Sequence, residues 1–141
     1  MTHLSGRERV SILLALCDPK EQAEFLGAMR PTGWHVETAR SFDEALAVLQ
    51  QSNVSVIVTQ HKPGAGFSWL DLLEAAWRFD PAPRIIVTDR LADEALWAEV
   101  LNLGAFDLLM QPFEPEEVFR VITYAWRSWK EAARQVRRGA A

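Results

Sequence analysis

The chain has 141 residues (16.0 kDa), 49% of them hydrophobic and 24% charged, which suits one compact domain and excludes long disordered segments. A single cysteine excludes an internal disulfide and a multi-cysteine zinc site. No apolar run is of membrane-spanning or signal-peptide type, so we expect a cytoplasmic protein without a membrane segment. The net charge of -4 divides into -9 before Arg120 and +5 from there on (six Lys or Arg against one Glu), and this acidic body argues against nucleic-acid binding.

Five short apolar runs alternate with amphipathic segments along the chain. We expect strands in these runs, which cover residues 11–16, 34–39, 54–59, 84–88 and 106–110. The first, third and fourth runs consist almost entirely of Val, Ile and Leu, as in strands that are buried on both faces of a parallel sheet. The second run has polar residues at alternate positions, which predicts a strand at the edge of the sheet.

Capping signals mark where the helices begin and end. Asp18 is an N-cap candidate followed by a Pro at the first helical position, and Ser41 opens a capping box. Apolar spacing predicts further helices over residues 67–79 and 93–103, the second of which stops at Gly104, and a last helix from about Pro115. Strands alternating with helices predict a parallel sheet covered on both faces, with its functional site at the C-terminal ends of the strands.

Motifs that follow the strands resemble those of the response-regulator receiver domain, the phosphoacceptor module of two-component signalling. They are Leu16-Cys17-Asp18-Pro19, Lys62-Pro63-Gly64, Thr88, Leu103-Gly104-Ala105-Phe106-Asp107 and Gln111-Pro112-Phe113. The resemblance covers about residues 10–129 and implies a doubly wound (βα)5 flavodoxin-like fold with strand order 2-1-3-4-5. It leaves an N-terminal arm at residues 1–9 and a basic C-terminal helix extension at residues 130–141.

In receiver domains an acidic pair after the first strand and an Asp ending the third hold magnesium, and that Asp accepts the phosphoryl group. A Thr or Ser ending the fourth strand and a Lys after the fifth bind the phosphoryl oxygens. In this chain the matching positions carry other residue types. Leu16 and Cys17 stand at the acidic pair, Thr59 at the phosphoacceptor and Gln111 at the Lys. Thr88 agrees with the family, and Leu108 lies where the family often has a Tyr or Phe that moves on activation.

These replacements predict a site that holds no metal or cofactor and transfers no phosphoryl group, in a pocket that we expect to be electrically neutral. We therefore expect a pseudo-receiver that is not an enzyme and acts on a signalling protein by phosphorylation-independent contact. Two alternatives stay open: a receiver fragment of a larger regulator whose output domain is missing, and a flavodoxin-like cofactor or thiol protein that uses Cys17.

Three single residues have competing interpretations. Asp18 is either a surviving metal ligand or the cap of the first helix, and the capping pattern favours the cap. Cys17 is either a reactive thiol or a small core residue, and a lone cysteine is more often the latter. His61 is either a phosphoacceptor or an ordinary exposed loop residue, and we expect the exposed loop.

The last helix carries a heptad-like apolar pattern with spacings of 3 and 4. Its members are Val118, Ile122, Ala125, Trp129, Ala132 and Val136. We interpret the pattern as the seam of a homodimer or as a helix that leads into a further module, with an ordinary last helix packed on the sheet as the alternative. Trp97 and Trp126 lie on helices that the resemblance places beside the fifth strand, and we include them in the candidate interaction surface because Trp is favoured at interface hot spots.

Overall fold

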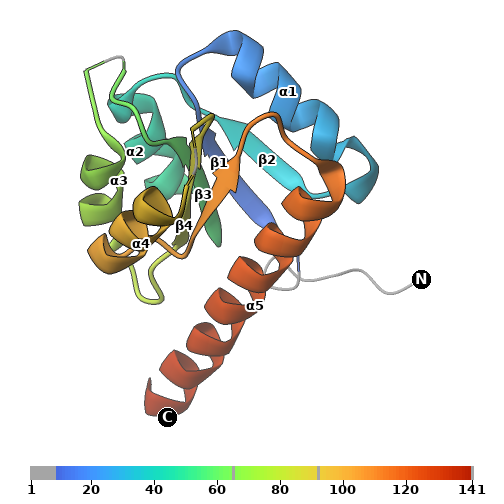
Figure 1. Ribbon diagram of the computed structural model, residues 1–141. Coiled ribbons are helices and arrows are strands. Elements are labelled where there is room, and N and C mark those ends of the chain that lie inside the picture. Colours follow the sequence, from blue (N-terminus) through green and yellow to red (C-terminus); the bar gives the residue numbers. More distant parts are fainter. Residues whose placement is uncertain (1–8, 65, 92, 141) are drawn as a thin grey trace.

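The computed structural model describes residues 9–64, 66–91 and 93–140, and it contains one five-stranded parallel sheet (Figure 1). The strands are β1 (Ser11–Ala15), β2 (His35–Thr38), β3 (Val56–Gln60), β4 (Arg84–Asp89) and β5 (Asp107–Met110). Their order across the sheet is β2-β1-β3-β4-β5, which confirms the predicted topology. In the described part of the chain, no helix is both long enough and apolar enough to cross a membrane.

Helices cover both faces of this sheet, as the alternation of elements predicts (Figure 1). One face carries α1 (Pro19–Met29) and α5 (Pro115–Ala140), and the other carries α2 (Phe42–Gln51), α3 (Trp69–Ala76) and α4 (Glu94–Leu103). A single 3₁₀ turn, η1 (Arg30–Thr32), follows α1. The sheet is therefore the middle layer of three, and its C-terminal edge lies beneath the loops that lead into the helices.

Side-chain caps fix the start of most helices. The Asp18 carboxylate accepts the Lys20 N–H at 2.9 Å, which confirms Asp18 as the cap of α1. The predicted helix over residues 67–79 is wrong at both ends: α3 ends at Ala76, three residues earlier, and begins at Trp69, two residues later. Ser68 and Asp71 form the capping box there, and Phe67 before it is buried in the core.

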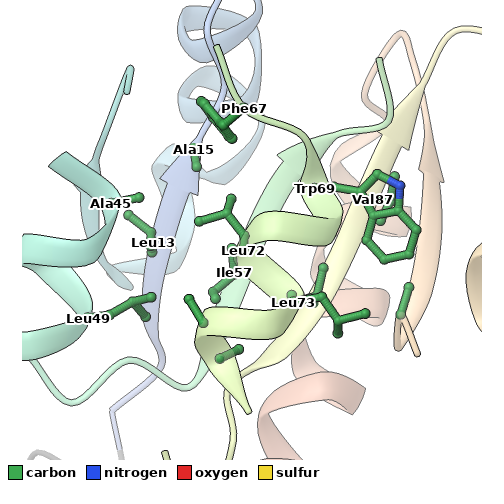
Figure 2. Packing of buried hydrophobic residues seen from close by; sticks show 14 of the residues in the cluster. Leu13, Ala15, Ala45, Leu49, Ile57, Phe67, Trp69, Leu72, Leu73 and Val87 are labelled. Carbon is green, nitrogen blue, oxygen red and sulfur yellow. The ribbon is translucent and has the colours of Figure 1, made fainter. Parts of the chain in front are cut away.

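Successive residues of each strand point into opposite layers, and each layer has its own apolar core. Leu13 and Ile57 lie in the core beneath α2, α3 and α4, and the same core contains Leu72 and Trp69 of α3 (Figure 2). Leu14 on the same strand points the other way, into the core beneath α1 and α5. This alternation decides which polar side chains can reach the cavity at the strand ends.

Helix α5 packs against the sheet through the apolar pattern that we interpreted as a dimer seam. Val118, Ile122, Ala125 and Trp129 are no more than 3% exposed, so their assignment to an interaction surface is wrong. The first four of the six buried α5 residues belong to the core beneath α1 and α5. The six form one stripe: Val118, Val121, Ile122, Ala125, Trp129 and Ala133. The spacing of 3 and 4 is shared by dimer seams and by helices that pack on a sheet, which explains the misassignment.

Arg84, the first residue of β4, ties the middle of α5 to the sheet. Its guanidinium donates to Ser128 Oγ at 3.0 Å and to the Ala82 carbonyl at 2.8 Å. Burial lowers the pKa of Arg84 from its usual value, although an arginine keeps its charge in proteins. The helix is therefore anchored by a charged hydrogen-bonded group as well as by apolar contacts.

Candidate functional site

A cavity of about 360 Å³ opens at the C-terminal edge of the sheet, where open parallel α/β sheets bind their ligands. Loops after β1, β3, β4 and β5 form its walls. The lining residues are Cys17, Asp18, Glu21, Gln60, Lys62, Pro63, Gly64, Thr88, Asp89, Arg90 and Gln111. The structure thus brings together four of the residues that the sequence analysis assigned to the site: Cys17, Asp18, Thr88 and Gln111.

Gln60, and not Thr59, is the β3 residue that lines the cavity. Thr59 is fully buried, and its hydroxyl donates to the Ala15 carbonyl at 2.9 Å. The next residue points to the opposite side of the sheet, so the Gln60 side chain reaches the cavity wall. Its carboxamide oxygen accepts the Cys17 N–H at 2.9 Å, and its NH2 group donates to the Cys17 sulfur at 2.9 Å. The end of β3 therefore presents an amide to the cavity.

Two further polar groups on the cavity wall are buried without a hydrogen bond among the described residues. Thr88 is 1% exposed and Gln111 is 5% exposed, yet Thr88 Oγ1 and Gln111 Nε2 have no partner there. A buried polar group costs free energy when nothing bonds to it, and both of these groups belong to residues on the wall of the open cavity. Both groups are neutral hydrogen-bonding groups.

Leu16 and Leu108, the remaining predicted positions, do not line this cavity. Leu16 is fully buried in the core beneath α1 and α5. Leu108 is 8% exposed and belongs to the core beneath α2, α3 and α4. Both leucine side chains pack in the cores. Of the two residues that follow β1, Leu16 and Cys17, only Cys17 reaches the cavity, and it offers a thiol but no metal-binding oxygen.

The prediction of an electrically neutral pocket is wrong, because its wall contains three carboxylates and two cationic groups. Each carboxylate has a partner. Asp18 caps α1, Glu21 faces the Arg90 guanidinium at 3.9 Å, and Asp89 accepts both the Leu91 N–H at 2.7 Å and a bond from His61 Nδ1 at 3.1 Å. Within the described residues, no group of three or more His, Cys, Asp or Glu side chains is placed to hold a metal ion.

The contact between His61 and Asp89 was not foreseen from the sequence. We expected an exposed loop histidine, but His61 is partly buried and its backbone N–H donates to the Thr88 carbonyl at 2.8 Å. Gln60, Asp89 and Arg90 were also missed as cavity residues. The available signal was position alone, since all three stand at or just after the C-terminal end of a strand.

A second hollow of about 310 Å³ lies between α4, β5 and α5. We call it the α4–α5 groove, and its lining residues are Asp93, Glu94, Trp97, Leu108, Met110 and Glu117. Trp97 is 50% exposed, and its indole N–H donates to Asp107 at 3.1 Å, which holds the ring across the groove. The groove therefore combines an apolar floor with three carboxylates and has no cation among its lining residues.

The remaining residues of the predicted interaction surface are partly accessible. Trp126 is partly buried, and the Lys130 ammonium lies 4.8 Å from the centre of its ring. Val136 is also partly buried. Trp97 is thus the predicted member with the most exposed side chain.

No protein-family model and no curated protein matches the sequence. Solved structures do match its fold, at low sequence identity. The signal receiver domain of a putative Luxo repressor protein from Vibrio parahaemolyticus superposes with a TM-score of 0.75 at 16% identity, over 86% of this chain and 93% of that one. A CheY-like response regulator receiver domain protein from Methanospirillum hungatei gives 0.73 at 21% identity, over 87% and 98%.

The chemotaxis response regulator CheY4 of Vibrio cholerae gives a TM-score of 0.69 at 20% identity, over 83% of this chain and 98% of that chain. Each of these proteins is matched along nearly its whole length, and the matches agree with the order of strands in the sheet. The chain therefore has the fold of a response-regulator receiver domain.

Proposed function

We propose that this chain is a pseudo-receiver, a signalling module that acts by protein contact and without accepting a phosphoryl group. The observation that carries the proposal is the chemistry of the cavity at the end of the sheet. Gln60 stands at the end of β3, Gln111 follows β5, and Cys17 follows β1. These three positions carry amides and a thiol. None of them offers a carboxylate that could bind magnesium or attack a phosphoryl donor.

The three carboxylates of the cavity do not replace the missing group. Asp18 holds the first turn of α1, and Asp89 is engaged by His61 and by the Leu91 N–H. Glu21 faces Arg90, which also approaches Glu24 at 3.8 Å. The positions of the carboxylates point the same way, since among the described residues no three or more His, Cys, Asp or Glu side chains are grouped to hold a metal ion.

Incubation with magnesium and acetyl phosphate, followed by intact-mass spectrometry, tests this proposal. We expect no phosphoryl adduct on the wild-type chain. As a positive control on the fold, the variant Cys17→Asp/Gln60→Asp/Gln111→Lys restores the acidic residues and the lysine at the cavity and is expected to gain a magnesium-dependent adduct. An adduct on the wild-type chain, mapped to Asp89, Asp18 or His61, would overturn the proposal.

The α4–α5 groove is the surface that we assign to partner contact. Its three carboxylates and its half-exposed Trp97 suit a partner that presents an apolar side chain between basic residues. Binding to such a partner is expected to be lost in Trp97→Ala and retained in Trp77→Ala, a matched control, because Trp77 is 62% exposed at the end of α3. Equal loss in both variants, or a requirement for acetyl phosphate, would contradict the assignment.

A further inference from the structure

Helix α5 carries a second stripe, on the side opposite to the buried one. We call it the outer stripe, and it follows the spacing 3, 4, 3, 4, 3. Its members are Glu117, Arg120, Tyr124, Arg127, Glu131 and Arg134. All of them except the partly buried Glu117 are exposed, and Tyr124 is 52% exposed. Figure 1 shows α5 extending past the sheet toward its C-terminus, where none of the other described helices and strands covers it.

The order of charges along the outer stripe is complementary to itself when the helix is reversed. Reversal about a point between Ala125 and Trp126 pairs residues whose numbers add to 251. Glu117 then faces Arg134, Arg120 faces Glu131, and Tyr124 faces Arg127. The first two contacts are ion pairs, and the third is a cation–π contact between a guanidinium and a phenol ring.

We propose that two copies of this chain associate through the outer stripe of α5, with the two helices antiparallel. A two-fold axis makes each contact occur twice, because a symmetric interface uses the same patch on both copies. Parallel helices would instead place each residue against its own copy, so that Glu117 meets Glu117 and Arg120 meets Arg120. Like charges directly opposite each other oppose association, so the sequence of the stripe selects the antiparallel arrangement.

The ends of the helix add to the same complementarity. Glu114 and Glu116 stand at the start of α5, whereas Arg137 and Arg138 stand in its last turn. In the antiparallel arrangement the acidic start of one helix lies beside the basic end of the other. Among the described residues, Glu114, Glu116 and Glu117 take part in no ion pair, so these charges are free for a second copy.

One contact within the helix competes with the proposed pairing. The Arg134 guanidinium lies 3.5 Å from Glu131 on the same helix, and both side chains are about half exposed. Exposed ion pairs of this kind are weak and exchange partners readily. We therefore expect a salt-sensitive dimer whose association is largely lost at about 1 M NaCl, where the Debye length is about 3 Å.

Sedimentation equilibrium at low salt over a concentration series tests the proposal. The wild-type chain is expected to move from 16.0 kDa toward twice that mass. Glu117→Arg alone and Arg134→Glu alone are each expected to weaken association about tenfold or more, because each places two like-charge contacts in the interface. The double variant Glu117→Arg/Arg134→Glu exchanges the two charges and is expected to restore wild-type association.

The double variant also tests the direction of the helices, since in a parallel dimer it would still pair like with like. Glu74→Arg on α3, an exposed position away from α5, has the same charge change as Glu117→Arg and is expected to leave association unchanged. Circular dichroism of each variant checks that α5 stays helical. A monomer at all concentrations up to about 1 mM, or a double variant as weak as its parents, would overturn the proposal.

Spin labels give an independent measure of the direction. In a Cys17→Ser background, a label at Gln135→Cys lies 19 residues from its symmetry-related copy along antiparallel helices, or about 30 Å. Parallel helices would bring the labels to about 10 Å of each other. A short distance would overturn the antiparallel arrangement.

This inference rests on the proposed function for its meaning in signalling, because it names a second copy as one contact partner. The two can nevertheless fail separately. Association is measured without any phosphoryl donor, and the mass-spectrometric test does not depend on the oligomeric state. A chain that is phosphorylated and still dimerises would overturn only the proposed function, and an unphosphorylated monomer would overturn only the dimer.

Discussion

The hydroxyl group of Thr88 has no hydrogen-bond partner among the described residues, although Thr88 is 1% exposed. Val has nearly the same shape and no polar group, so Thr88→Val is expected to raise the free energy of unfolding by about 1 kcal/mol. Urea unfolding with an unchanged m-value is the measurement. Thr59→Val is the matched control, because the Thr59 hydroxyl donates to the Ala15 carbonyl and its loss is expected to destabilise the protein.

A loss of stability in Thr88→Val similar to that in Thr59→Val would contradict this prediction. It would mean that the Thr88 hydroxyl group is satisfied after all. The free energies of unfolding of the two variants therefore distinguish a buried hydroxyl that stabilises the protein from one that destabilises it.

The exact cavity residue on β3 could not be predicted from the sequence. The resemblance to receiver domains assigns the phosphoacceptor position to Thr59. In the sheet Thr59 pairs with Ala15 and its side chain is buried, whereas Gln60 lines the cavity. A shift of one residue reverses which face of the sheet a side chain occupies. Strand register depends on contacts between segments about 44 residues apart, which no local pattern encodes.

At the scale of elements, Gly104 ends α4 with a φ of 120°, in the region that side chains other than glycine rarely adopt. A Cβ atom there would lie 3.2 Å from Leu73 Cδ2 and 3.3 Å from the Trp77 ring. Gly104→Ala is therefore expected to lower the free energy of unfolding by about 1–3 kcal/mol, as measured by urea unfolding.

Gly27→Ala is the control for this prediction, because Gly27 lies inside α1 and an added Cβ would meet nothing within 4 Å. It is expected to stabilise the protein by about 0.5–1 kcal/mol, since alanine is the better helix former. Equal effects of the two substitutions would show that neither the conformation nor the crowding at Gly104 matters.

The elements themselves were largely predictable. Caps and apolar periodicity locate the strands and the starts of α1, α2 and α4 because these signals act within a few residues. They do not tell which partner an apolar stripe meets, and this is why the stripe of Val118 and Ile122 suggested a dimer seam when it packs on the sheet of its own chain.

At the scale of the whole molecule, few buried contacts lie beyond Ala133. A truncation after Ala133 keeps the buried Trp129 and the bonds between Arg84 and Ser128, but it removes Arg134 and the basic end of α5. Its free energy of unfolding is expected to stay within about 1 kcal/mol of the wild-type value. Self-association is expected to be lost, as measured by sedimentation equilibrium. A truncated chain that unfolds readily, or that still dimerises, would contradict this division of roles.

The amide walls of the cavity have a consequence for timing. A receiver domain that accepts a phosphoryl group stays active until the acyl phosphate bond is hydrolysed. With Gln60 and Gln111 at the cavity, and under the function proposed above, the lifetime of the active state is not set by hydrolysis of a phosphoryl group. Its output would follow its own abundance, and for a weak pair the assembled form grows with the square of concentration, so that doubling synthesis would raise it roughly fourfold.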